Sequence, residues 1–209
     1  MNTVDTKRIF TIALTFSEEV EKRLTTLGED HQQYKKYNIV PHVTLVYPFV
    51  PVFSLFKVKE QLERVAKRTV EFNIILNGIE YFEGEHNVAY AAIENKRAVK
   101  KLHADIIESL DGLIKEWYTD GKYNLENFVP HVTIINNIPS RILPDVKKRF
   151  SRRKLRYENK IAGFSLFAEL SGDWQISRVF NFSGDKLGRM SLSNEKGISP
   201  AERGEGLLE

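Results

Sequence analysis

The segment PHVTLVYPF, at Pro41–Phe49, shares its first four residues with PHVTIINNI, at Pro130–Ile138. The repeated histidines, His42 and His131, are 89 residues apart. Both segments are rich in apolar and β-branched residues and are predicted to be strands. A tetrapeptide repeated at this distance in a short chain indicates a duplicated unit, because chance rarely places it twice in the same register.

The order of elements after each PHVT segment supports the duplication. A helical pattern follows each segment, then a strand with a phenylalanine four residues after a glycine, then a last strand. Gly78 and Phe82 in the first half match Gly163 and Phe167 in the second, and the glycines are 85 residues apart. We therefore predict an α+β fold of two similar lobes, each a mainly antiparallel sheet with helices on its outer face. A doubly wound α/β fold is disfavoured because the strands come in adjacent pairs and no glycine-rich loop follows the first strand.

The chain divides into one folded unit and a tail. We expect residues 1–183 to form a single bilobal domain whose lobes exchange around residues 95–130. A long amphipathic helix is predicted within that region, at Lys96–Trp117, from apolar residues spaced by three and four. Residues 184–209 are rich in Gly, Ser, Glu and Lys and are predicted to be a flexible C-terminal tail.

The composition excludes several kinds of chemistry. The 209 residues include no cysteine, which excludes a disulfide scaffold, a thiol nucleophile and any metal site with sulfur ligands. The net charge of +3 is too small to indicate a nucleic-acid-binding protein by itself. Only a short apolar stretch follows the charged residues of Met1–Phe10, so we expect no signal peptide and no membrane span, and we expect a cytoplasmic monomer.

The PHVT strands place chemically active side chains on one face. Because side chains alternate along a strand, His42 and Thr44 project together, and so do His131 and Thr133. Two such strands related by an approximate two-fold axis would bring two imidazoles and two hydroxyls to one cleft. One neutral imidazole can accept a proton while a protonated one donates to a departing oxygen, and the hydroxyls can bond to phosphate oxygens. This scheme requires no metal and no other cofactor.

The paired His-x-Thr motifs, each preceded by proline, resemble those of the 2H phosphoesterase superfamily, which includes the 2′-5′ RNA ligase and cyclic phosphodiesterase family. The ending GDWQISRVFNF resembles the closing strand of that family, and the likeness covers residues 8–183. The resemblance implies a central cleft and metal-independent attack on 2′,3′-cyclic phosphates or 2′-5′ linkages. By position it implies His42 and His131 as catalytic residues and Thr44 and Thr133 as phosphate-binding residues.

Other residues are weaker candidates. Tyr90 and Trp174 lie on or beside strands that could reach the cleft, and an aromatic ring there could stack on a nucleobase, although a core position is the simpler reading. The basic run Lys147–Lys160 could attract RNA, although most such runs are solvated helix faces. His103 is expected to be a hydrogen-bonded histidine beside the core, and Tyr47 a packing residue on the strand face opposite Thr44 unless Pro48 distorts the strand.

Two classes of function follow from these residues. The first is a phosphoesterase that acts on nucleotides or RNA with a terminal or cyclic phosphate, in which the sequence leaves open which histidine is the base. The alternative is a non-catalytic protein that binds RNA ends or nucleotides in the same cleft. An acyl or sugar hydrolase is disfavoured, because the chain has neither a G-x-S-x-G motif nor an obvious carboxylate pair.

Overall fold

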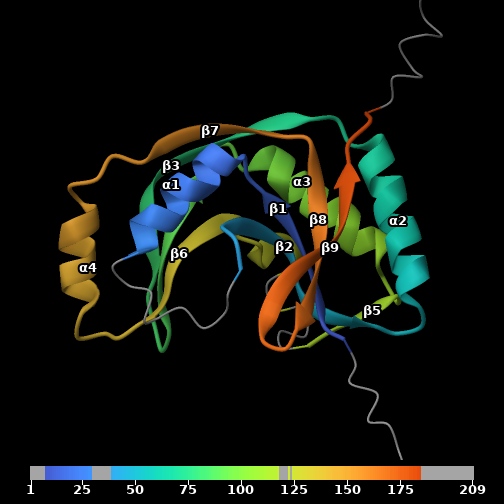
Figure 1. Ribbon diagram of the computed structural model, residues 1–209, viewed down its shortest axis with the longest axis horizontal. Helices are drawn as coiled ribbons and strands as arrows, with labels where there is room; N and C mark the ends of the chain where they lie inside the picture. The colour runs from blue at the N-terminus through green and yellow to red at the C-terminus, as the bar shows by residue number, and fades with distance from the viewer. Residues whose placement is uncertain (1–7, 30–38, 118–121, 123, 185–209) are drawn as a thin grey trace, which may run out of the picture.

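The computed structural model describes residues 8–29, 39–117, 122 and 124–184. These residues form two antiparallel sheets with four α-helices and a short 3₁₀ helix (Figure 1), which confirms the predicted α+β class. The predicted tail, apart from Gly184, lies outside the described residues. None of the described helices is long and apolar enough to cross a membrane.

One sheet has five strands in the order β5 (Ile114–Glu116), β2 (His42–Pro51), β1 (Phe10–Thr15), β8 (Gly163–Leu170) and β9 (Asp173–Asn181). The other has four, in the order β6 (His131–Ile138), β4 (Asn87–Ile93), β3 (Phe72–Phe82) and β7 (Arg156–Ile161). The helices are α1 (Glu18–Gly28), α2 (Leu55–Arg68), α3 (Arg97–Ser109), η2 (Leu125–Asn127) and α4 (Leu143–Phe150). The two PHVT segments thus begin β2 and β6, one in each sheet.

The sheets do not correspond to consecutive halves of the chain. The five-stranded sheet contains the first motif strand, β2, but also the hairpin β8–β9 from the end of the chain. The four-stranded sheet contains the second motif strand, β6, and the hairpin β3–β4 from the first half. The chain passes from one sheet to the other within residues 95–130, as predicted for the lobes. It also changes sheets between β2 and β3 and between β7 and β8, which the prediction did not include.

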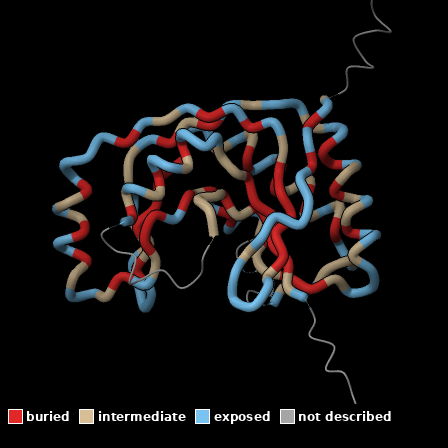
Figure 2. The backbone as a smooth tube through the Cα atoms, viewed as in Figure 1, coloured by how far each residue is buried: buried red, intermediate tan, exposed pale blue. Residues whose placement is uncertain are grey.

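The buried faces of the sheets carry the apolar residues of the motifs. Val43 and Val132 have no exposed surface, whereas the neighbouring His42 and His131 are half-buried, as strand alternation predicts. Helices α2 and α3 pack against the five-stranded sheet, and α1 packs against β6 of the other (Figure 1). Figure 2 shows the buried segments concentrated on the strands between the helices. Packing of one face thus leaves the histidine face of each motif strand available for a site.

The long helix predicted at Lys96–Trp117 is wrong in its second half. The helix α3 ends at Ser109, and Gly112 then adopts a left-handed φ of +67° in a turn. The residues that follow form β5, which pairs with the end of β2. The apolar spacing persists through this stretch because Leu110 and Leu113 still face the core, so periodicity alone does not reveal the turn. Gly78 also adopts a left-handed φ, of +78°, at an irregularity of β3.

Candidate active site

The two motif histidines make the same hydrogen bond. The Nδ1 of His42 lies 2.7 Å from the carbonyl oxygen of Val40, and the Nδ1 of His131 lies 2.7 Å from that of Val129. A carbonyl oxygen only accepts, so Nδ1 carries a proton in both rings. In the neutral form of each imidazole, Nε2 is then an acceptor and points away from the backbone that holds the ring. The two repeated histidines therefore share the same tautomer, with the proton on Nδ1, as well as the same sequence motif.

The hydroxyl of Thr44 lies beside the first histidine. Its Oγ1 is 3.1 Å from the Nε2 of His42, and with Nδ1 protonated the hydroxyl is the donor of this bond. The corresponding Thr133 is exposed on β6. Both hydroxyls lie on the histidine face of their strands, as the alternation predicts.

A β-bulge follows the threonine in both motif strands. The pairing of β1 with β2 passes from Ala13↔Thr44 to Ile12↔Val46, and that of β4 with β6 passes from Tyr90↔Thr133 to Ala89↔Ile135. The extra residue at this point is Leu45 in β2 and Ile134 in β6, and it shifts the alternation by one position. A second irregularity follows in each strand, before Phe49 in β2 and before Ile138 in β6.

The shift changes which side chains share the histidine face of each strand. Strict alternation therefore no longer places Tyr47 opposite Thr44, and its role as a packing residue stays a prediction. The corresponding residue of the second motif, Asn136, lies on the face of Thr133. Sequence reasoning missed Asn136. The signal that could have found it is the pair of adjacent buried apolar residues after each threonine, which breaks strict alternation.

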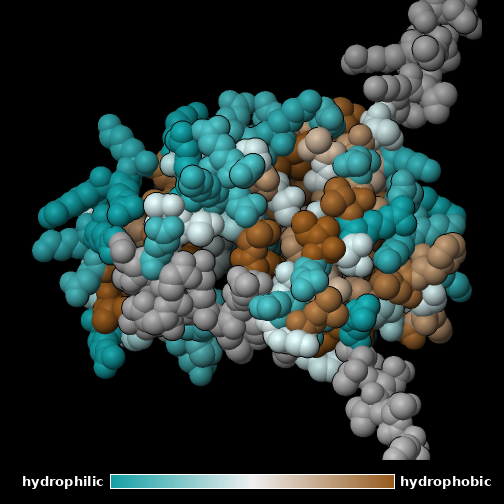
Figure 3. All heavy atoms as spheres, in the orientation of Figure 1, coloured by the Kyte–Doolittle hydropathy of each residue, from teal (hydrophilic) through white to brown (hydrophobic). Residues whose placement is uncertain are grey.

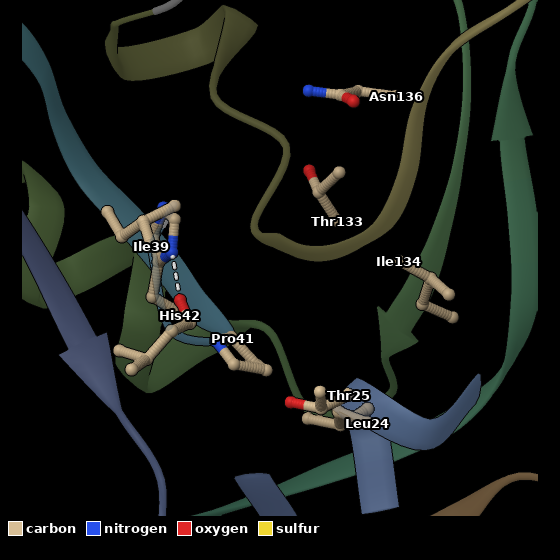
Figure 4. A pocket seen from close by; sticks show the side chains of 9 residues that line it. Leu24, Thr25, Ile39, Pro41, His42, Thr133, Ile134 and Asn136 are labelled. Atoms are coloured by element: carbon tan, nitrogen blue, oxygen red, sulfur yellow. Dashed lines mark hydrogen bonds between the residues drawn. The ribbon is translucent and has the colours of Figure 1, made fainter. Parts of the chain in front are cut away.

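A pocket brings residues of the two motifs together (Figure 4). It is lined by Leu24, Thr25, Ile39, Val40, Pro41, His42, Thr133, Ile134 and Asn136. His42 from the first motif and Thr133 from the second therefore face the same space, with α1 forming another wall. The Oδ1 of Asn136 is buried without a hydrogen-bond partner among the described residues. The pocket thus offers an imidazole, a hydroxyl and an amide to one ligand.

Burial lowers the pKa of both motif histidines. Desolvation lowers the pKa of His42 below its ordinary value of 6.5, and the hydrogen bond to the Val40 carbonyl opposes this in part. A positive charge on His131 lowers the pKa of His42 further, because like charges repel at close range. Burial likewise lowers the pKa of His131, and the bond to the Val129 carbonyl opposes it. This repulsion disfavours the state in which both rings are protonated at once.

Aromatic side chains surround His131. Its ring makes edge contacts with Phe82 and Tyr90, with centroids 4.9 and 5.2 Å away. Tyr90 is only 5% exposed, stacks on Phe82 at 4.2 Å and donates a 2.8 Å hydrogen bond to Glu80. Burial and the nearby Glu80 raise the pKa of Tyr90 to about 12. In this arrangement Tyr90 packs against the histidine, and stacking of a nucleobase on it stays a prediction.

The repeated phenylalanines support the histidines crosswise. Phe82, from the first half of the chain, contacts the ring of His131. Phe167, from the second half, has its ring centroid 6.3 Å from that of His42. Trp174 is half-buried in the β8–β9 hairpin and pairs with Glu169, which places it on the sheet face of Phe167. Stacking of a base on Trp174 also stays a prediction. Each half of the chain thus completes the surroundings of the other half's histidine.

The sequence profile described as "2'-5' RNA ligase superfamily" matches residues 16–173. The chain belongs to this superfamily. The match contains both PHVT motifs, the bulges that follow them and the repeated phenylalanines. The resemblance inferred from the motifs alone is confirmed.

The curated proteins that this chain resembles share about a quarter of its residues in the matched region. The Geobacillus kaustophilus protein named "Putative phosphoesterase GK0864" is 26% identical over 148 residues, covering 70% of this chain and 80% of that protein. The Oceanobacillus iheyensis protein named "Putative phosphoesterase OB1230" is 24% identical over 180 residues, covering 83% and 98%.

Solved structures share the superfamily fold. The Thermus thermophilus protein TT0787 matches with a TM-score of 0.59 at 20% identity, covering 85% of this chain and 99% of that one. Escherichia coli LigT in its apo form matches with a TM-score of 0.59 at 13% identity, covering 84% and 97%. LigT has also been solved with 3′-AMP and with phosphate. At these identities the likeness shows the fold alone.

Some of the positive charge of the basic run Lys147–Lys160 is paired with acidic residues in the structure. Within the basic run Lys147–Lys160, Lys147 bonds to Glu83 at 2.6 Å and Arg156 to Glu94 at 2.7 Å. These acids offset part of the positive charge, although the end of the molecule around α4 is strongly hydrophilic (Figure 3). Across the part of the chain that the structure describes, no group of three His, Asp or Glu residues is arranged to hold a metal ion.

Proposed function

We propose that this superfamily member is a metal-independent phosphoesterase that cleaves 2′,3′-cyclic phosphate or 2′-5′ phosphodiester bonds in nucleotides or RNA ends. The observation that carries the proposal is the duplicated Nδ1-to-carbonyl bond, which directs the Nε2 atoms of His42 and His131 away from the backbone, where that of His42 accepts a hydrogen bond from the Thr44 hydroxyl. The names of the curated relatives support a phosphoesterase, and the LigT complexes with phosphate and 3′-AMP support a phosphorylated nucleoside as ligand. We further propose that it acts in the cytoplasm as a monomer.

The proposed reaction divides acid and base work between the two rings. The Nε2 of the neutral histidine takes a proton from water as the water oxygen forms a bond to phosphorus. The Nε2 of the protonated histidine gives its proton to the ribose oxygen as the phosphorus–oxygen bond to that oxygen breaks. Thr44 and Thr133 donate hydrogen bonds to non-bridging oxygens, where negative charge is concentrated in the transition state. Either ring can start as the base, and the reverse direction exchanges the two roles.

The proposed function predicts turnover without metal. Purified protein incubated with nucleoside 2′,3′-cyclic phosphates and with 2′-5′ linked dinucleotides should release product at the same rate with and without EDTA, as followed by chromatography. Loss of activity on chelation would contradict the metal-independent scheme. Saturable binding of these ligands with no product at any enzyme concentration would favour the non-catalytic alternative.

The pH dependence follows from the direction of the histidine pKa shifts. Both pKa values are lowered from 6.5 in the free protein, and activity needs one ring protonated and the other neutral. We therefore expect a bell-shaped profile of kcat/KM with its maximum below about pH 6.5. On the alkaline side the rate should fall by about tenfold per pH unit as the acid loses its proton. A profile that rises between pH 6.5 and 8 would contradict this assignment.

A further inference from the structure

His103 is a third buried histidine, outside both motifs. It lies on α3 and is 1% exposed. Its Nδ1 donates a 2.7 Å hydrogen bond to the carbonyl oxygen of Leu45, and its Nε2 accepts a 2.9 Å bond from the backbone N–H of Leu125. Its ring stacks on Phe128 with centroids 3.8 Å apart and an angle of 14° between the planes. The prediction of a hydrogen-bonded histidine beside the core is confirmed, but its partners give it a further role.

The partners of His103 belong to the two segments that carry the site. Leu45 is the extra residue of the β2 bulge and directly follows Thr44. Leu125 begins η2, which leads through Phe128 into Val129, the residue whose carbonyl holds the ring of His131. One imidazole therefore contacts the first motif strand on one side and the approach to the second motif on the other.

We propose that His103 is a positioning residue that fixes the first motif strand relative to the second, and hence Thr44 relative to His131. This proposal rests on the proposed function, because its catalytic consequence is a change in the rate of phosphodiester cleavage. His103 acts through the backbone of Leu45 and of η2 and does not itself contact the substrate.

Three features of the contacts favour a histidine at this position. The carbonyl of Leu45 belongs to a bulge, where the strand ladder is disrupted, and the N–H of Leu125 belongs to a residue with a left-handed φ of +53°. A neutral imidazole with Nδ1 protonated donates to the first and accepts from the second in one plane. The same ring offers a flat face to Phe128. Burial lowers the pKa of His103, which keeps the ring in the neutral form that both bonds need.

The alternative is that His103 only fills space in the core. The variant His103→Phe separates the two roles, because it keeps an aromatic ring against Phe128 and removes both hydrogen bonds. Ile106→Ala is the matched control, since Ile106 lies one turn along α3, has no exposed surface and is outside the contacts described above. His103→Asn is the conservative variant, because its amide can still donate to the Leu45 carbonyl.

Kinetics with a nucleoside 2′,3′-cyclic phosphate test the proposal, at a temperature where circular dichroism shows every variant folded. We expect His103→Phe to lower kcat by about tenfold or more, because small misplacements of catalytic groups are costly, with little change in KM. His103→Asn should recover part of the loss, and Ile106→Ala should keep kcat within about twofold despite a lower Tm.

Wild-type kcat in folded His103→Phe, or an equal loss in Ile106→Ala, would overturn the proposal. If His103→Phe does not fold, His103→Leu takes its place, because it also removes both hydrogen bonds, and a wild-type kcat in folded His103→Leu would overturn the proposal.

A spectroscopic readout separates this proposal from the proposed function. If the wild-type protein hydrolyses none of the substrates, the proposed function has failed, but the position of the motifs can still be measured by nitrogen-15 NMR. We expect His103→Phe or His103→Asn to shift the ring signals of His131 and the backbone amide of Thr44, and Ile106→Ala to leave both in place. Unchanged signals in the His103 variants would overturn the positioning role.

Discussion

His42→Gln and His131→Gln are each expected to lower kcat for 2′,3′-cyclic phosphates by about 10²–10⁴-fold, the usual contribution of a general acid or base. Each ring is held through Nδ1 by a backbone carbonyl and presents Nε2 for proton transfer. Glutamine cannot take up and release a proton near neutral pH. Both rings are only half-buried, so the substitutions should leave the fold intact.

The double variant is expected to be little worse than either single variant. Acid and base act on the same bond exchange, and groups that act as a unit lose their effect together. Steady-state kinetics of the two single variants and the double variant measure this, with His86→Gln, in an exposed position, as the control. Full turnover by the double variant would refute the paired-histidine mechanism.

Thr44→Val and Thr133→Val are each expected to lower kcat by about 10²–10³-fold, the effect of removing one hydrogen-bond donor to a developing oxyanion. Valine keeps the β-branched shape that suits a strand, so the change removes the hydroxyl and little else. KM should change less than kcat, because the bonds to the non-bridging oxygens strengthen in the transition state.

The threonine prediction has a matched control in Thr69. This residue caps the end of α2, where its hydroxyl bonds to the Val65 carbonyl at 2.7 Å, and it lies outside both motifs. Thr69→Val should lower stability and leave kcat unchanged. Equal kcat losses in Thr69→Val and Thr133→Val would show that the measured effect is one of folding rather than of phosphate binding.

Much of the candidate site follows from local sequence physics. The alternation along PHVT predicts that His42 and Thr44 share a face while Val43 is buried, and the structure agrees. The α+β class follows from paired strands and intervening amphipathic helices. These features depend only on residues near one another in the chain.

What the sequence could not supply depends on contacts between distant segments. The bulge at Ile134 brings Asn136 to the face of Thr133, where it lines the pocket, and a bulge is defined by its partner strand. The crosswise support of His131 by Phe82 depends on which sheet each hairpin joins, and the order of elements does not determine that. The early end of α3 is set by Gly112 and by pairing of β5 with β2.

The central claim is that the two PHVT motifs form a single phosphate site. Nitrogen-15 NMR of the histidine rings during a titration with inorganic phosphate tests it most directly. We predict that the Nε2 signals of His42 and His131 shift together, with one dissociation constant and a stoichiometry of one phosphate per chain. A shift of only one ring, or two rings that shift with different dissociation constants, would contradict the claim.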